Sequence, residues 1–139
     1  MVDRLVETRK GRSMTSKIGW PMWIGVVVAD LSQQRDFYGR VMGLRELDAG
    51  SDWIQFKLGD RRLLEIIAQD PGAPEYRKPG YQVGFEVSDI HAASDDLVAQ
   101  GAEAITGVLG GPESWNHWRY FRDAEGNPFE LSQRVRGRS

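Results

Sequence analysis

Two stretches of this chain share one pattern, and that pattern decides the fold: residues 24–43, IGVVVADLSQQRDFYGRVMG, and residues 83–101, VGFEVSDIHAASDDLVAQG. In each stretch an apolar run typical of a strand leads through Asp30 or Asp89 into a helical segment that ends near a glycine. An aspartate in this place is a good N-cap, because its carboxylate accepts amide hydrogens of the first helical turn. The two aspartates are 59 residues apart and their neighbours keep that offset, so the sequence predicts an internal repeat.

Short strands separated by turn residues follow each predicted helix. They are predicted at Leu44–Leu47, Trp53–Leu58 and Arg62–Ala68 in the first half, and at Ala104–Val108, His117–Arg122 and Pro128–Gln133 in the second. Each half therefore reads β-α-β-β-β, and residues 70–80, with three prolines and two glycines, are predicted to link the halves. We expect an α+β fold in which residues 18–69 and 81–133 form two tandem modules of one domain, because a half of this size buries too little surface alone.

Composition agrees with one globular domain, since 40% of the 139 residues are hydrophobic and 27% are charged. The charges are unevenly spread: residues 18–133 carry ten basic and eighteen acidic side chains, whereas residues 1–17 and 134–139 are basic. We predict a mobile basic N-terminal arm over residues 1–17 and a basic C-terminal tail over residues 134–139. An acidic body would repel a phosphate backbone, so nucleic acid is not an expected partner.

Several classes of protein are excluded by residues that the sequence lacks. It has no cysteine and only two histidines, which excludes a disulfide scaffold, a zinc finger and a cysteine nucleophile. No apolar run approaches the roughly 18 residues of a membrane span, and the charged start lacks the apolar region of a secretory signal. The sequence therefore predicts a soluble cytoplasmic protein with no membrane partner.

Polar residues interrupt the predicted strands where apolar ones are expected. Side chains of a strand alternate between its two faces, so Trp23 and Gln82, which are repeat equivalents, should lie on the face away from the helices. Glu65 in RLLEIIA and Glu130 in PFELSQ are equivalents in the same sense. Burying a lone carboxylate is costly unless it is paired, protonated or bound to a metal. These four positions are therefore predicted to face one common site.

The sequence resembles the vicinal oxygen chelate superfamily, which includes glyoxalase I, bleomycin resistance proteins and extradiol dioxygenases. The resemblance rests on VxVADL and FYGRVMGL in the first half, FEVSDI in the second, and YFRDAEGNPFEL near the end. It implies that the two βαβββ modules form a U-shaped cup, that the protein is a homodimer, and that metal ligands lie on the cup floor.

The resemblance also assigns ligand positions. The first family ligand, usually histidine, falls on Trp23, which cannot coordinate a metal, while the others fall on Glu65, Gln82 and Glu130. These three oxygen donors suit a divalent metal such as Mn, Fe(II), Ni, Mg or Zn. The implied chemistry is polarisation of vicinal oxygens of a small-molecule substrate by a lyase, isomerase or dioxygenase, with Glu130 or Glu65 as the catalytic base.

An alternative function needs no metal. Both histidines of the usual ligand set are absent, and aromatic residues are abundant, so the protein is alternatively a small-molecule or antibiotic-binding protein with an aromatic-lined cup. The residues expected to contact a ligand are Trp23, Trp53, His117, Trp118 and Tyr120. Trp115 belongs to the same aromatic set, although packing in the core or at a dimer interface explains such residues equally well.

Overall fold

The computed structural model describes residues 17–74, 77, 80–114 and 116–135. Its strands are β1 (Ile18–Val28), β2 (Glu46–Ala49), β3 (Trp53–Leu58), β4 (Arg62–Ala68), β5 (Gly80–Val87), β6 (Glu103–Ala104), β7 (Asn116–Arg122) and β8 (Pro128–Arg134). Its helices are α2 (Leu31–Asp36), the π-helical turn η1 (Phe37–Val41) that continues it, and α3 (Ile90–Ala99). Residues 1–16, 136–139 and Trp115 lie outside the described residues, so the predictions for the arm, most of the tail and Trp115 stay predictions.

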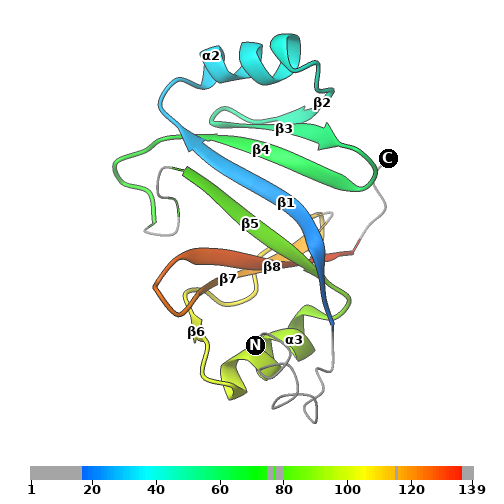
Figure 1. Cartoon of the computed structure of the whole chain (residues 1–139), viewed down its shortest axis with the longest axis vertical. Helices are drawn as coiled ribbons and strands as arrows, with labels where there is room; N and C mark the ends of the chain where they lie inside the picture. Colours follow the sequence, from blue (N-terminus) through cyan, green and yellow to red (C-terminus); the bar gives the residue numbers. More distant parts are fainter. Residues whose placement is uncertain (1–16, 75–76, 78–79, 115, 136–139) are drawn as a thin grey trace, which may run out of the picture.

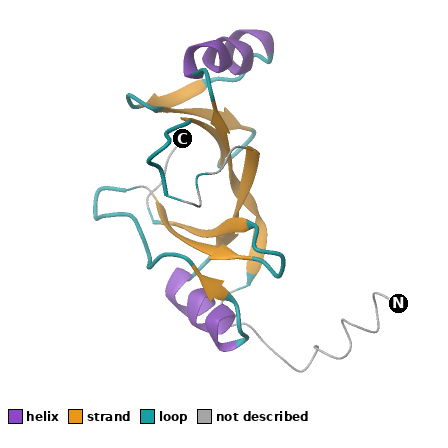
Figure 2. Cartoon of the chain, turned by 90° about the vertical axis from the view of Figure 1, so that its left-hand side faces the viewer, coloured by secondary structure: helices purple, strands orange, loops and turns teal. Residues whose placement is uncertain are grey.

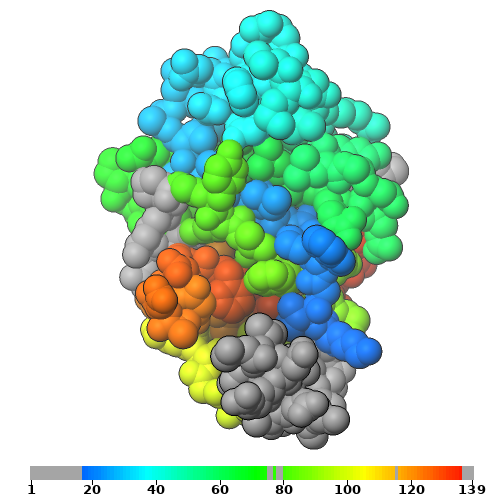
Figure 3. Space-filling view, viewed as in Figure 1, coloured from blue at the N-terminus to red at the C-terminus, as the bar shows by residue number. Residues whose placement is uncertain are grey.

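All eight strands belong to one mixed sheet in the order β2-β3-β4-β1-β5-β8-β7-β6 (Figure 1). β1 and β5, the first strands of the two repeats, pair antiparallel at the centre. Each also pairs in parallel with the last strand of its own repeat, β4 or β8. In the space-filling view the surfaces of β1 and β5 adjoin between the two halves (Figure 3). The predicted α+β fold of two repeated βαβββ units is confirmed.

The helices lie at opposite ends of the molecule on the outer side of the curved sheet (Figure 2). Asp30 caps α2 by accepting from the amide of Gln33, and Asp89 caps α3 by accepting from the amides of His91 and Ala92. Both helical segments end before a glycine with positive φ, Gly43 (75°) or Gly101 (97°), a conformation that glycine adopts without steric cost.

Each helix packs on apolar side chains of its own half of the sheet. One buried cluster joins the first helical segment to strands β1, β3 and β4: Val26, Tyr38, Ile54, Phe56, Leu64 and Ile66. The second cluster joins α3 to strands β5, β7 and β8: Val87, Ile90, Ala93, Phe121 and Leu131. Because Ile24 and Val83 are paired across β1 and β5, both clusters lie on the same face of the continuous sheet. We call this face the outer face and the opposite one the inner face.

The structure differs from the sequence prediction in three elements. The predicted strand Ala104–Val108 is reduced to Glu103–Ala104, because the amides of Ile105 and Thr106 both donate to the carbonyl of Tyr120 and break the regular ladder. The strand predicted at Leu44–Leu47 begins later, at Glu46. The first helix changes to π-helical geometry at Phe37, a change that apolar periodicity does not reveal.

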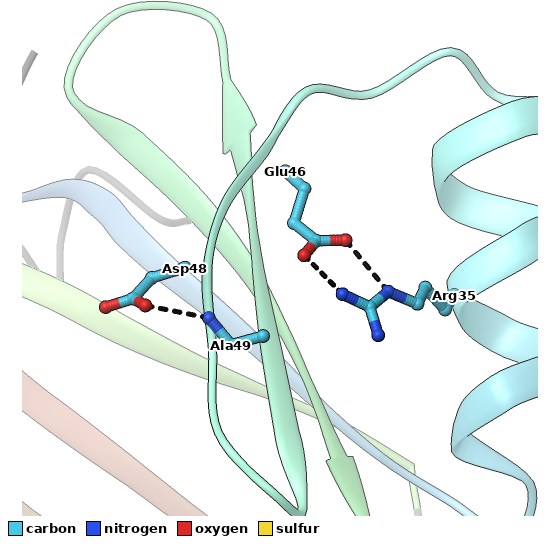
Figure 4. A network of polar contacts seen from close by, with 4 residues as sticks. All are labelled: Arg35, Glu46, Asp48 and Ala49. Carbon is cyan, nitrogen blue, oxygen red and sulfur yellow. Dashed lines mark hydrogen bonds and ion pairs between the residues drawn. The ribbon is translucent and has the colours of Figure 1, made fainter.

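The edge strand β2 is tied to the first helix by an ion pair. Arg35 Nε and Nη2 donate to Glu46 Oε1 and Oε2 at 3.0 and 2.5 Å (Figure 4). Both side chains lie near the surface, so this bidentate contact orients α2 against β2 more than it stabilises the fold. Among the described helices, none is long and apolar enough to cross a membrane.

Candidate functional site

The inner face brings the predicted site residues together in two rows across the sheet. Residues paired on neighbouring strands point to the same face, so the strand register defines each row. One row runs Gln55, Glu65, Gly25, Gln82. The next runs Leu63, Trp23, Gly84, Glu130, Tyr120. Glu65, Gln82, Glu130 and Trp23 thus lie on the central strands, where the two repeats meet.

Trp23 lies over the backbone of its own strand. A Cβ atom added to Gly25 would overlap the indole ring, so the ring fills the space that this glycine leaves. Its Nε1–H donates to Glu65 Oε1 at 2.8 Å. Trp23 is only 6% exposed and packs with Met22, Val27, Leu63 and Ile67. The indole therefore belongs to a second, inner core and also binds one carboxylate of the candidate site.

The equivalent glycine of the second repeat holds a different group. A Cβ atom added to Gly84 would lie 2.7 Å from Glu130 Oε1, so the Glu130 side chain occupies the space above Gly84. Ser132 Oγ lies 2.5 Å from Glu130 Oε1, and Tyr120 also forms a hydrogen bond with this carboxyl group. Glu130 is only 3% exposed. The repeat is thus asymmetric at its centre, with an indole over Gly25 and a carboxyl group over Gly84.

The electrostatics of the two carboxyl groups follow from burial. Desolvation raises the pKa of Glu130 to about 8, although hydrogen bonds from Ser132 and Tyr120 oppose the shift. Desolvation also raises the pKa of Glu65, while the hydrogen bond from Trp23 lowers it. The positive charge of Arg77 lowers the pKa of both groups. Near neutral pH a carboxyl group with the pKa of Glu130 exists in both protonation states, as general acid–base chemistry requires.

Arg77 is a site residue that sequence reasoning missed. It lies in the stretch between β4 and β5, where turn-forming residues suggested only a linker. Its spacing and its neighbours in the sequence indicate no role, because Arg77 acts electrostatically on Glu65 and Glu130 only in the folded chain. The available signal was that two buried carboxylates need a nearby cation.

The predicted ligand-contacting residues do not all reach the inner face. Trp53, paired with Ile67, packs beside the Trp23 cluster, and Trp118 and Tyr120 pair with Ser132 and Glu130. His117 instead pairs with Gln133, whose side chain accepts from the first amide of α3. The structure therefore places His117 on the outer face, away from Glu65 and Glu130.

The donor set differs from the ligand set that the resemblance implies, and its surroundings are unfavourable for a divalent metal. Trp23 presents an N–H donor, which cannot coordinate a metal, and it already binds Glu65 Oε1. The oxygen Oε1 of Glu130 is engaged by Ser132, and the charge of Arg77 already acts on both carboxyl groups. Within residues 17–74, 77, 80–114 and 116–135, no three His, Cys, Asp or Glu side chains are placed to bind one metal ion.

Solved structures of several enzymes share this fold. Methylmalonyl-CoA epimerase from Mycobacterium tuberculosis is 21% identical, with a TM-score of 0.69, over 89% of this chain and 93% of that one. The Mn(II)-bound glyoxalase from Novosphingobium aromaticivorans is 17% identical, with a TM-score of 0.66, over 89% of this chain and 42% of that one. Homoprotocatechuate 2,3-dioxygenase from Arthrobacter globiformis is 17% identical, with a TM-score of 0.71, over 88% of this chain and 38% of that one.

At these identities the structural likeness shows the fold alone, and this chain spans less than half of the glyoxalase and of the dioxygenase. No curated protein matches the chain. A family model does match it, over residues 20–131, which include every described strand and helix at least in large part. The chain therefore belongs to the Glyoxalase/Bleomycin resistance protein/Dioxygenase superfamily.

Proposed function

We propose that this protein is a metal-independent member of the superfamily that binds a flat, aromatic small molecule on the inner face of its sheet. The observation that carries the proposal is the 2.8 Å hydrogen bond from Trp23 Nε1 to Glu65 Oε1. This contact engages one of the two oxygens of Glu65, and the indole itself lies where the superfamily resemblance puts another ligand. Glu65 Oε2, Gln82 and Glu130 remain as possible donors, but Glu130 is a weak ligand near neutral pH, because a carboxyl group with a pKa of about 8 is then largely protonated.

The aromatic residues of the inner face support the choice of ligand. Trp53 and Trp118 are half-buried, so part of each ring remains accessible, whereas Trp23 and Tyr120 are buried. Aromatic rings bind flat ligands by stacking, and indole and phenol groups add directional hydrogen bonds. Glu65, Glu130 and Arg77 supply the polar contacts that orient a ligand in an otherwise apolar site.

The second candidate is an enzyme that uses a divalent metal held by Glu65, Gln82 and Glu130. It is favoured by the placement of all three residues on the central strands of one face, and by the enzymes that share the fold. In that case the metal would polarise vicinal oxygens of the substrate, and Glu130 would hold or move a proton. The two candidates differ in what a metal does to the free energy of unfolding.

A metal titration separates the candidates. We expect Mn²⁺, Ni²⁺, Fe²⁺, Mg²⁺ and Zn²⁺ to leave the melting temperature of the chelator-treated protein unchanged, because an ion without a native site cannot stabilise the native state. The Glu65→Gln/Glu130→Gln variant is the matched control for nonspecific effects. A rise seen with the unmodified protein and lost in this variant would contradict the proposal and establish the metal-dependent candidate.

Ligand binding is tested separately with 2-naphthol, a flat and uncharged aromatic probe, followed by fluorescence quenching. Removing the Trp118 ring should weaken binding by about 1 kcal/mol, roughly fivefold. Trp20→Ala is the matched control, because Trp20 is 78% exposed and near the start of β1. Binding that is lost in Trp20→Ala but retained in Trp118→Ala would place the probe elsewhere and refute the aromatic site.

A further inference from the structure

Each repeat builds the same small unit on the inner face of the sheet. The unit consists of a tryptophan, a hydrogen-bonding side chain two positions later and a glutamate on the next strand: Trp53, Gln55 and Glu65 in the first repeat, and Trp118, Tyr120 and Glu130 in the second. In both units the middle residue pairs with the glutamate across the two strands and forms a hydrogen bond with its carboxyl group. The half-buried tryptophan is the diagonal neighbour of the glutamate, about 7–8 Å away, a separation that an aromatic side chain can span. The inner face therefore presents an aromatic ring beside a carboxyl group twice.

The two carboxyl groups differ in how far a ligand can reach them. Glu130 is only 3% exposed, whereas Glu65 is half-buried. Glu130 fills the space above Gly84, while the equivalent space above Gly25 is filled by the ring of Trp23. The indole therefore keeps the carboxyl group of Glu65 out of the position that buries Glu130. Of the two carboxyl groups, Glu65 is the one that a ligand on the inner face can contact.

The contacts of Glu65 within the chain orient its carboxyl group and leave part of its acceptor capacity. Trp23 Nε1 donates to Oε1 at 2.8 Å, and the side chain of Gln55 also donates to this carboxyl group. Arg77 acts on the group through its positive charge. A carboxylate can accept about four hydrogen bonds, so two donors from the chain do not saturate it. The remaining capacity lies beside the half-buried ring of Trp53, where a stacked ligand would present its edge.

We propose that Glu65 determines the specificity of this face by selecting flat aromatic ligands that carry a hydrogen-bond donor, a hydroxyl or N–H group, at the edge of the ring. The inference rests on the proposed function and deepens it by naming the polar group of the ligand. A ligand that shields Glu65 from water without offering a donor leaves a desolvated acceptor unpaired, which costs binding free energy. The tryptophan rings bind both kinds of ligand, because stacking requires only a flat apolar surface.

The test compares 2-naphthol with 2-methoxynaphthalene, which has the same rings but a methyl group in place of the hydroxyl hydrogen. Fluorescence quenching of the full chain measures both affinities. We expect the unmodified protein to bind 2-naphthol at least about tenfold more tightly. Glu65→Leu removes the acceptor and should bring the two affinities to within about twofold of each other. Glu65→Gln keeps an oxygen for the N–H group of Trp23 and serves if the leucine variant does not fold; it should reduce the preference, because a neutral amide oxygen is a weaker acceptor than a carboxylate.

Two further variants separate selection from stacking. Trp118→Ala should weaken both probes by a similar factor and leave the ratio of their affinities unchanged, because it removes a ring and no acceptor. Glu125→Gln removes a carboxylate from an exposed turn outside the inner face and should change neither affinity.

Each other outcome contradicts a definite statement. Equal affinities of the two probes for the unmodified protein, both lowered by Trp118→Ala, would overturn the role of Glu65 and leave the proposed function intact. A preference for 2-naphthol that persists undiminished in the folded Glu65 variants would assign the selection to another acceptor and also overturn it. If neither probe binds the chain, the proposed function fails, and the role of Glu65 fails with it.

Discussion

Glu130 is the residue at which burial has the largest chemical consequence. Its carboxyl group is almost fully buried above Gly84, and desolvation raises its pKa to about 8. A carboxyl group in this state binds a proton more tightly in the folded chain than in the unfolded chain. Folding and protonation are therefore linked, and the linkage has a definite sign.

We expect the stability contributed by the protonated Glu130 to be fully present below the ordinary glutamate pKa of about 4.5 and to be lost as the pH rises through about 8. Glu130→Gln removes this titration but can keep a hydrogen bond to Ser132. The free energy of unfolding of the variant should therefore rise by a few kcal/mol, relative to that of the unmodified protein, as the pH increases from 5 to 8. Denaturant unfolding across this range measures the difference, and Glu125→Gln in an exposed turn is the control. If the two proteins differ in free energy of unfolding by the same amount at every pH, Glu130 titrates normally and the prediction is wrong.

Among the local features of the helices and strands, the helix caps are predicted best from the sequence. Asp89 accepts from two amides of α3, whose residues Ile90 and Ala93 are fully buried against the sheet. Asp89→Ala should cost about 1 kcal/mol of unfolding free energy, because two amides of the first turn lose their partner. Asp89→Asn, which can still accept these bonds, should cost much less. Thermal unfolding measures both variants. If Asp89→Ala and Asp89→Asn lose the same unfolding free energy, the charge of Asp89 stabilises the helix and its capping hydrogen bonds do not.

Other properties of the elements depend on the whole fold and could not be predicted from local pattern. The strand parity of Trp23, Glu65, Gln82 and Glu130 was correct, since alternation is a local property of extended chain. The face of His117 could not be predicted, because the predicted strand has no register against β8 and so does not reveal that His117 pairs with Gln133 on the outer face. Arg77 shows the same limit, as its charge acts on residues of β4 and β8 that are distant in sequence.

At the scale of the whole molecule, the pairing of β1 with β5 makes one sheet from the two repeats. The inner core around Trp23 and the carboxyl group of Glu130 both lie beside this junction. The prediction that the chain forms a homodimer stays a prediction, and light scattering tests it against the 15.7 kDa mass of one chain. Within one chain, the central pairing already covers the edges that β1 and β5 would otherwise expose.

This continuity predicts that the two repeats unfold together. Each half alone would expose the edge of β1 or β5 and the apolar side chains beside it, so a half-folded chain should be too unstable to populate. Far-ultraviolet circular dichroism reports the whole sheet. Tryptophan fluorescence weights the first half, where Trp20, Trp23 and Trp53 lie. We expect the two signals to change with one midpoint in urea, and a variant that disturbs either half, such as Asp89→Ala, to shift both midpoints equally. Separate midpoints would mean that the β1–β5 junction only joins two independently stable units, and that the inner face is not held rigid by the fold as a whole.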